Sequence, residues 1–571
     1  MTKRWIIAAA LASLSLSGTV YALGTDRAVG TPLNPPKEKL DNAACLACHQ
    51  PVKKLHERGA HKDLNCGSCH TAKPEHMKTP SAENRPATRF DYGSCSQCHT
   101  AQHKDLMDPK YHYEWAEKFG NPGYTFLRDE EDGWARSVQF KFPRFHPGIM
   151  SDFLANRANG RFKYDSKRDQ GVPQEDHWKA ITDKFEENGE LMKGDVIGIG
   201  WRPHKGREGS QDSRCLLCKT SETMLEYQYD LMVPNPKGYD FSSPVVPMLK
   251  ETNTSFNCNM CHDPHSAEPR IIFSPLIESM AGKNGADNYY QKNAGKDGLP
   301  KIEVVDMGVR GFTRKIGILS DYNANFQCGQ CHNGANRYLN YKHVENGKPV
   351  TKEELEKAGV SPYSTEFLGN PIKTYEWFKK MGWYQGIHGV TGAKYINGSD
   401  HPHVEMLINS KHGKAGVDCA DCHFAKKADG TMEHQPSLPK QKVENTCMRS
   451  DCHGPGTKDN WTRTGQALYT IEAIQQEHRI RTMKMEMAAK EAQRMLKAVK
   501  EKKAVIADKE YKALMEAFEQ YLSVRDYFWT DYSIGFHSPE AADTSLTKCI
   551  WDLRAANKAA KKVFKEVQNT K

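Results

Sequence analysis

The sequence is poor in hydrophobic residues for its length. Only 38% of its 571 residues are hydrophobic, and the mean hydropathy is −0.74. After residue 22 no run is apolar enough to cross a bilayer, so we expect no internal membrane-spanning helix. There is no nucleic-acid-binding motif, and the net charge of +9 is spread along the chain, so we expect no nucleic acid partner.

The N-terminus has the three parts of a secretory signal. Lys3 and Arg4 precede an apolar stretch, and Val20-Tyr21-Ala22 resembles a small-x-Ala cleavage site. This pattern predicts a signal peptide over residues 1–22, cleaved near Ala22, and therefore a periplasmic mature protein. An uncleaved membrane anchor is the alternative, which the short length of the apolar stretch disfavours.

Sixteen of the 17 cysteines form eight pairs. Six pairs are separated by two residues and followed by His: Cys45, Cys48 and His49; Cys66, Cys69 and His70; Cys95, Cys98 and His99; Cys258, Cys261 and His262; Cys328, Cys331 and His332; Cys419, Cys422 and His423. The seventh, Cys447, Cys452 and His453, has four residues between its cysteines. The eighth is Cys215-Leu216-Leu217-Cys218-Lys219, where Lys replaces His.

A Cys-x-x-Cys-His run attaches haem c covalently, and its His ligates the iron. The alternatives are disulfides or zinc sites, but a His directly after the second Cys is not the zinc pattern. The repetition predicts eight covalently bound haem c groups, which also explains the polar composition, because porphyrins supply core volume. The seventeenth cysteine, Cys549, is predicted to be a buried, inert thiol.

Seven electron-transfer haems each require a sixth iron ligand, and a second His is the usual one. The candidates are ten histidines outside the motifs, which spacing alone does not pair: His56, His61, His76, His103, His112, His265, His388, His412, His434 and His537. A surface position is the alternative for each.

Lys219 marks one haem as different from the others. A haem with two His ligands passes electrons but has no position for a substrate, whereas catalysis requires an open one. We therefore expect the Lys219 haem to be the reactive one. The alternative is a surface Lys219 with another side chain on the iron.

The chain is predicted to be mainly α, a multihaem cytochrome c with little strand, a haem-packed core and a C-terminal bundle of long helices. After the signal we expect a three-haem segment over 23–103, a haem-free wrapping segment over 104–214, a five-haem catalytic core over 215–455 and a helical domain over 456–571. Long helices are expected over 465–500, 504–532 and 540–567, packed on the haem domain or between subunits of a homo-oligomer.

The Lys219 motif, followed by four His-ligated motifs, resembles the pentahaem cytochrome c nitrite reductases, whose catalytic haem is also Lys-ligated. The three upstream motifs make the whole resemble the octahaem nitrite reductases, related to the hydroxylamine oxidoreductases. The resemblance is best within 215–455. It implies a reductase with a small anionic substrate and a quinol-linked cytochrome as electron donor.

The resemblance also implies site residues. His401, in His401-Pro402-His403, takes the role of the catalytic distal His. His412, His434 and His537 take the roles of distal haem ligands, and we assign His61 and His265 to the same role. Where the nitrite reductases have Gln before the catalytic His, this chain has Asp400, which is more like the hydroxylamine oxidoreductases.

Three further features of the family have partial counterparts. Arg202 and Arg207 lie where its anion-binding Arg is expected, with Arg214 as a rival. Tyr338 stands near the position of its catalytic Tyr, at a different offset. The family's calcium site depends on a Glu-Tyr-Tyr stretch that is absent after His332, so calcium is the least supported of the implied cofactors.

These features predict a periplasmic octahaem reductase that converts nitrite or hydroxylamine to ammonia. Three alternatives remain: hydroxylamine oxidation, which Asp400 favours and Lys219 opposes; reduction of tetrathionate or sulfite on a similar scaffold; and a non-catalytic electron carrier.

Overall fold

The structure is a computed structural model that describes residues 39–106, 146, 218–225, 252, 256–281, 299–307, 315–333, 369–396 and 402–567, with short gaps inside several of these ranges. The predicted signal peptide lies outside the described residues, as does nearly all of the predicted wrapping segment. The predicted domain boundaries therefore stay predictions.

The N-terminal segment consists of short helices around its three Cys-x-x-Cys-His motifs. They are α2 (Asn42–Cys48), α3 (Gln50–Arg58), the 3₁₀ turn η1 (Cys66–Ser68), α4 (Pro74–Lys78), α5 (Tyr92–Ser96) and α6 (Thr100–Leu106). The Asp41 side chain caps α2 by accepting from two backbone N–H groups. In this segment the buried hydrophobic residues described are Leu46, Leu55 and Leu106, too few for a core of side chains alone.

This segment is docked on the middle of the chain where α3 ends. Arg58 forms ion pairs with Glu268 at 3.0 Å and Glu303 at 2.6 Å. The next residues approach the 266 loop through backbone, and the Ala60 N–H donates to the Ser266 carbonyl at 2.9 Å. A Cβ on Gly59 would lie 2.2 Å from the Ser266 Cα, so only glycine permits this approach.

The middle of the chain combines a small antiparallel sheet with short helices. Its strands are β1 (Arg270–Ile271), β2 (Ile302–Asp306) and β3 (Lys315–Leu319), in the order β1-β3-β2. The helical elements are η6 (Cys258–Met260), α14 (Ser274–Ala281), α16 (Ala324–Gly329), α20 (His403–Asn409), α21 (Lys411–Lys414), α22 (Cys419–His423) and η9 (Pro439–Gln441). One buried cluster, including Ile277, Ile316, Ile318 and Phe326, joins the sheet to α14 and α16.

Two glutamines of the Cys328 attachment loop, Gln327 and Gln330, join this loop to neighbouring elements. The buried Gln330 side chain accepts from the Ile272 and Phe273 N–H groups at 2.7 and 3.2 Å. The same side chain donates to the Met260 carbonyl at 3.0 Å. Gln327 donates to the Cys261 carbonyl at 2.8 Å. Hydrogen bonds from the buried Gln327 and Gln330 side chains thus fix the attachment loop at Cys328 against the loop at Cys258.

Three long helices follow, as predicted: α23 (Thr464–Lys500), α24 (Asp508–Thr530) and α25 (Pro539–Val563). They pack on one another through a large apolar cluster that includes Leu514, Leu522 and Leu553. Helix α24 is also covered by α19 (Pro371–Lys380), and β5 (Lys394–Tyr395), paired with β4 (Gly386–Ile387), lies against it.

The ends of the predicted helices differ from the observed ones. Residues 504–505 form β6 (Ala504–Val505), which pairs with β7 (Lys565–Glu566), so that α24 begins later and α25 ends earlier than predicted. Cys549 is fully buried on α25, and burial raises the pKa of its thiol, as expected of an inert cysteine.

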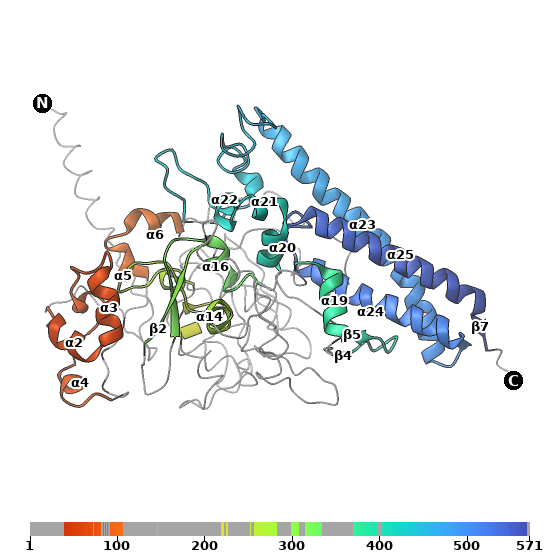
Figure 1. The fold of residues 1–571 in the computed structure, drawn as a ribbon, viewed down its shortest axis with the longest axis horizontal. Helices are drawn as coiled ribbons and strands as arrows, with labels where there is room; N and C mark the ends of the chain where they lie inside the picture. Colours follow the sequence, from red (N-terminus) through yellow and green to blue (C-terminus); the bar gives the residue numbers. More distant parts are fainter. Residues whose placement is uncertain are drawn as a thin grey trace, which may run out of the picture.

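The segments are arranged in chain order along the molecule (Figure 1). The N-terminal helices lie at one end, α16 and α20 to α22 lie in the middle, and the long C-terminal helices extend at the other end. The described part is mainly helical with little strand, which confirms the predicted fold class. None of its helices combines the length and apolarity needed to cross a bilayer.

Gly59→Ala tests the docking of the N-terminal segment. Its Cβ would clash with the Ser266 backbone, so we expect the free energy of unfolding to fall by about 1–3 kcal/mol, as for other overpacked sites. Hydrogen exchange should rise in α2 and α3. Gly389→Ala is the control, because its Cβ meets no atom within 4 Å. Equal effects from the two variants would contradict this account of docking.

Candidate haem-binding site

The attachment motifs open onto one continuous cavity of about 2730 Å³. Its wall includes both cysteines and the following His of all seven His-ligated motifs, together with Cys218 of the Lys motif. A pocket for one small ligand is typically about 300–1,000 Å³, so this space fits several large groups. The described cysteines are all free, which contradicts a disulfide framework. None of them belongs to a described group of three ligands that could share a metal ion.

Cysteines of different motifs lie close enough to perturb one another. A hydrogen bond with Cys95 and burial raise the pKa of Cys258, so the third and fifth motifs in the chain are neighbours. A hydrogen bond with Cys419 does the same to Cys328. Burial, together with the nearby Cys447, raises the pKa of Cys422 to about 12. The motifs therefore form a connected series rather than isolated sites.

The Lys219 motif joins this series through Cys331. The Cys331 Sγ lies 3.7 Å from the Cys218 carbonyl, and a hydrogen bond with Cys218 raises the pKa of Cys331. Lys219 is half-buried, and Cys218 lines the cavity whereas Lys219 does not. Cys215 lies outside the described residues.

Four pairs of histidine rings have the separation that one iron atom requires. Two imidazoles on opposite sides of a metal, each bonded at about 2.0–2.1 Å and with a ring radius of about 1.1 Å, have centroids about 6 Å apart. The observed centroid separations are 6.2 Å for His49 and His76, 6.2 Å for His61 and His99, 6.0 Å for His412 and His453, and 6.3 Å for His423 and His537. Each pair combines one motif His with one His from outside the motifs.

Two further pairs are indicated by electrostatics. Burial, together with the nearby His265 and His49, lowers the pKa of His70 to about 4. Burial likewise lowers the pKa of His262, and His434 contributes to the lowering. All four residues line the same cavity, which agrees with this pairing.

Many of these rings use Nδ1 for a hydrogen bond with the protein. His61 contacts the Pro264 carbonyl at 2.9 Å, His423 the Ser437 carbonyl at 3.0 Å, His537 the Asp531 carboxylate at 3.0 Å, and His70 the Thr88 hydroxyl at 3.1 Å. His453 contacts Asp459. Such a bond fixes the ring and its tautomer and leaves Nε2 for a metal. The residues present therefore fit haem.

His403 makes a different kind of contact. Its ring centroid lies 5.1 Å from those of His332 and His537, and its Nδ1 is 3.0 Å from the His332 Nδ1. These separations are too short for an iron atom between the rings. His403 is instead hydrogen-bonded to a motif His.

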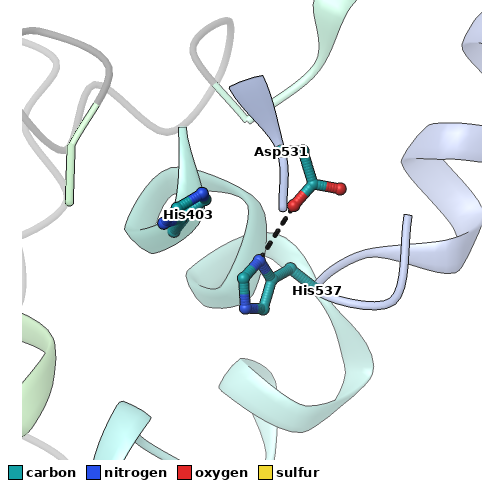
Figure 2. A group of neighbouring side chains, drawn as sticks. All are labelled: His403, Asp531 and His537. Atoms are coloured by element: carbon teal, nitrogen blue, oxygen red, sulfur yellow. Dashed lines mark hydrogen bonds and ion pairs between the residues drawn. The ribbon is translucent and has the colours of Figure 1, made fainter. Parts of the chain in front are cut away.

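Asp531 completes a buried cluster with His403 and His537 (Figure 2). Burial alone would raise the pKa of Asp531, but the hydrogen bonds from His537 and Ser533, beside the neighbouring His403 ring, outweigh burial and hold the pKa below its usual range. Ser533 and the Gly535 N–H also donate to this carboxylate. Three different elements, α20, the end of α24 and the loop before α25, meet in this cluster.

Two other candidate ligands, His56 and His388, make contacts with protein oxygens or aromatic rings. The His56 Nε2 contacts the Leu64 carbonyl at 3.1 Å. His388 packs on Phe518 and Tyr395, away from the cavity, with its Nδ1 on the Thr391 hydroxyl. His103 does not line the cavity, and His112 lies outside the described residues.

The predicted catalytic residues all lie outside the described residues. These are His401, Asp400, Arg207, Arg202 and Tyr338. The nearest described position is Pro402, which precedes α20. The Val404 N–H donates to the His332 carbonyl at 3.2 Å, so the start of α20 is attached to the motif that neighbours Cys218.

His403 and Asp531 were not predicted as functional residues. A signal for each was present: a second His two positions after His401, and an Asp six positions before His537. Neither spacing belongs to a metal-binding pattern, and only the fold brings the two residues together.

Comparison with known proteins agrees with this site. The model of the cytochrome c552 family matches residues 195–570, which include the Lys219 motif and the four motifs after it. Cytochrome c-552 of Bacteroides thetaiotaomicron is 24% identical over 333 residues, covering 57% of this chain and 54% of that protein. The cytochrome c nitrite reductase subunit NrfA of Nitratidesulfovibrio vulgaris is 27% identical over 323 residues, covering 52% and 50%.

Among solved structures, NrfA of Desulfovibrio desulfuricans superposes with a TM-score of 0.43 at 21% identity, covering 62% of this chain and 66% of that one. The chain spans about half the length of the curated relatives it matches. The family match covers more than half of the chain and includes five of the eight attachment motifs, whereas the three N-terminal motifs that also line the cavity precede it. This chain is therefore a multihaem c-type cytochrome that belongs to the cytochrome c552 family.

Proposed function

We propose that this chain is an exported octahaem cytochrome that reduces nitrite or hydroxylamine to ammonia at the haem of the Lys219 motif. The observation that supports the proposal most is that seven His-ligated motifs line one cavity together with Cys218 of the Lys motif. Such a series suits a reaction that needs many electrons, since nitrite takes up six electrons and eight protons to give ammonium and two waters.

The proposed iron ligands follow from the ring pairs. His49 with His76, His99 with His61, His423 with His537 and His453 with His412 would each hold one iron. His70 with His265 and His262 with His434 are proposed from their electrostatic proximity. His76 was one of the ten candidate ligands that spacing did not pair, and its ring now pairs with that of His49. Haem, when bound, supplies electron transfer and, at an open coordination position, Lewis-acid binding of the substrate nitrogen.

The chain's own residues would handle the anion and the protons. We propose that His401 donates protons, with Asp400 holding its ring, and that Arg207 or Arg202 holds the anion. Tyr338 is proposed to assist. The start of α20 is bonded to the His332 carbonyl, which belongs to the motif that neighbours Cys218, and His401 is two residues before α20 in the sequence.

The remaining parts of the proposal concern location and partners. The N-terminal signal pattern supports export to the periplasm, where a quinol-linked cytochrome would supply electrons. Calcium is not part of the proposal, because the Glu-Tyr-Tyr stretch is absent after His332.

We also propose a homodimer formed through α23. Ile480, Met483 and Met487 are 37%, 43% and 70% exposed, and their spacing of three and four places them on one face of the helix. A two-fold axis would pack this stripe against its own copy.

Replacing a proposed iron ligand should change the spin state of one haem. In His537→Leu, one low-spin haem loses its sixth ligand, so we expect a new high-spin signal by electron paramagnetic resonance with the haem count unchanged. His388→Leu is the matched control, because His388 lies away from the cavity, and its spectrum should equal that of the parent. A high-spin signal only in the control, or in neither variant, would contradict the pairing.

Turnover of small nitrogen oxides tests the activity. The haem-loaded protein with a reduced viologen should convert nitrite and hydroxylamine to ammonia, faster than it reduces tetrathionate or sulfite. His401→Asn should lower kcat by about 10²–10⁴-fold, the usual contribution of general acid catalysis, with His388→Asn unchanged. Absence of turnover with both nitrogen substrates would refute the proposed reaction and leave an electron carrier as the better reading.

Added charge on the α23 stripe tests the dimer. Met483→Glu with Met487→Glu should convert a dimer to a monomer in size-exclusion chromatography with light scattering, because buried carboxylates would repel across the axis. Ala513→Glu, at an exposed position of α24, should leave the dimer intact. A parent protein that is monomeric at micromolar concentration would contradict this interface.

A further inference from the structure

His332 is bonded to an imidazole, whereas the described iron ligands His61, His423 and His537 are bonded to oxygen acceptors. Its Nδ1 lies 3.0 Å from the Nδ1 of the buried His403. On its other side the His403 Nε2 lies 3.1 Å from the Thr530 carbonyl at the end of α24. His403 therefore connects a motif His to the backbone of a distant helix.

These two contacts favour one tautomer of His403. A carbonyl oxygen only accepts, so the His403 Nε2 carries the proton and donates it to Thr530. The Tyr532 N–H also points at this Nε2, but at 3.5 Å it is the longer contact, and the carbonyl decides the assignment. The neutral His403 then has an unprotonated Nδ1, which accepts from the His332 Nδ1–H. His332 keeps its Nε2 for iron.

The adjacent histidine has a carboxylate in the corresponding place. The His537 Nδ1–H donates to the Asp531 Oδ1 at 3.0 Å, and Asp531 is only 3% exposed. The ring of His537 faces that of the motif residue His423 at 6.3 Å. The haem attached at Cys419 and Cys422 would therefore have a carboxylate-bonded ligand, whereas the haem at Cys328 and Cys331 has a neutral imidazole acceptor.

The three clustered side chains are not a separate metal site. His537 directs its ring at His423, and the Asp531 oxygens accept from Ser533, Gly535 and His537. The His403 nitrogens are occupied by His332 and Thr530. The donor atoms that an ion would need are already in use, although they lie within 4.8 Å of one another.

We propose that His403 and Asp531 are positioning residues that set two neighbouring haems at different reduction potentials, with the lower potential at the Cys419–Cys422 haem and the higher at the Cys328–Cys331 haem. This inference rests on the haem ligation given under the proposed function. A carboxylate acceptor increases the basicity of an imidazole ligand, stabilises ferric iron and lowers the potential, whereas a neutral acceptor does so less.

The order of the two haems gives this difference a direction. Cys328 neighbours Cys419, and Cys331 neighbours Cys218 of the Lys219 motif. An electron passing from the Cys419–Cys422 haem to the Cys328–Cys331 haem would move to higher potential and toward the Lys219 motif. The Cys447–Cys452 motif neighbours Cys422, and its His453 is also bonded to a carboxylate, that of the more exposed Asp459. The acceptors thus favour delivery of electrons to the haem with the Lys ligand.

Spectropotentiometric titration of the full haem-loaded protein tests the inference. Asp531→Asn keeps the size of the side chain and removes its charge, so one midpoint potential should rise by ~59 mV. This shift corresponds to about a tenfold change in the one-electron reduction equilibrium constant. His403→Asp should lower a different midpoint and His403→Leu should raise it. His403→Gln retains a hydrogen-bond acceptor and is the more conservative change. Its midpoint potential should lie between those of His403→Leu and the parent.

Two controls separate a local effect from a general one. Asp429→Asn removes a carboxylate and His388→Leu removes an imidazole at positions outside the cluster. Both variants should leave all midpoint potentials unchanged. The inference is overturned if His403→Asp and His403→Leu move no midpoint or move one in the same direction, or if Asp531→Asn and the His403 variants move the same component. A parent protein with fewer than eight haems, or without nitrite and hydroxylamine turnover, would instead count against the proposed function.

Discussion

The structure depends on pairs of histidine rings held about 6 Å apart across one shared cavity. That spacing leaves room for an iron atom and excludes direct contact between the rings. Each pair joins a motif His to a His outside the motifs, so one metal would connect two parts of a chain that has few apolar side chains. The low hydrophobic content and the short helices of the N-terminal segment follow from this arrangement, because the cofactors take the place of a conventional core.

The sequence predicted what is encoded locally. Cysteine pairs followed by His are contiguous, and the low density of helix breakers after residue 464 predicted α23, α24 and α25 to within a few residues at most ends. The departures at 504–505 and 565–566 come from pairing between strands far apart in sequence, which composition does not encode. Ring pairing is not encoded by local spacing either: His423 on α22 and His537 before α25 come from different elements, and their rings lie 6.3 Å apart.

The residues around the iron ligands were less predictable than the ligands. His537 was identified, but Asp531, which holds its ring, stands at the end of a different helix. His403 differs from His401 by two positions in sequence, yet its ring is bonded to His332 and Thr530. Such residues have ordinary spacing and acquire their role from packing. They are also the groups that adjust the properties of a metal without binding it, which is why the acceptor on each Nδ1 matters for the direction of electron flow.

The position of iron in the haem-loaded protein tests the central claim most directly. Anomalous diffraction at the iron edge from crystals of the full chain locates each iron atom without reference to the ring geometry. The account predicts eight iron sites, with one between the rings of each of the four pairs and none among His403, Asp531 and His537. Iron absent from between those ring pairs, or a metal ion bound within the His403 cluster, would contradict it.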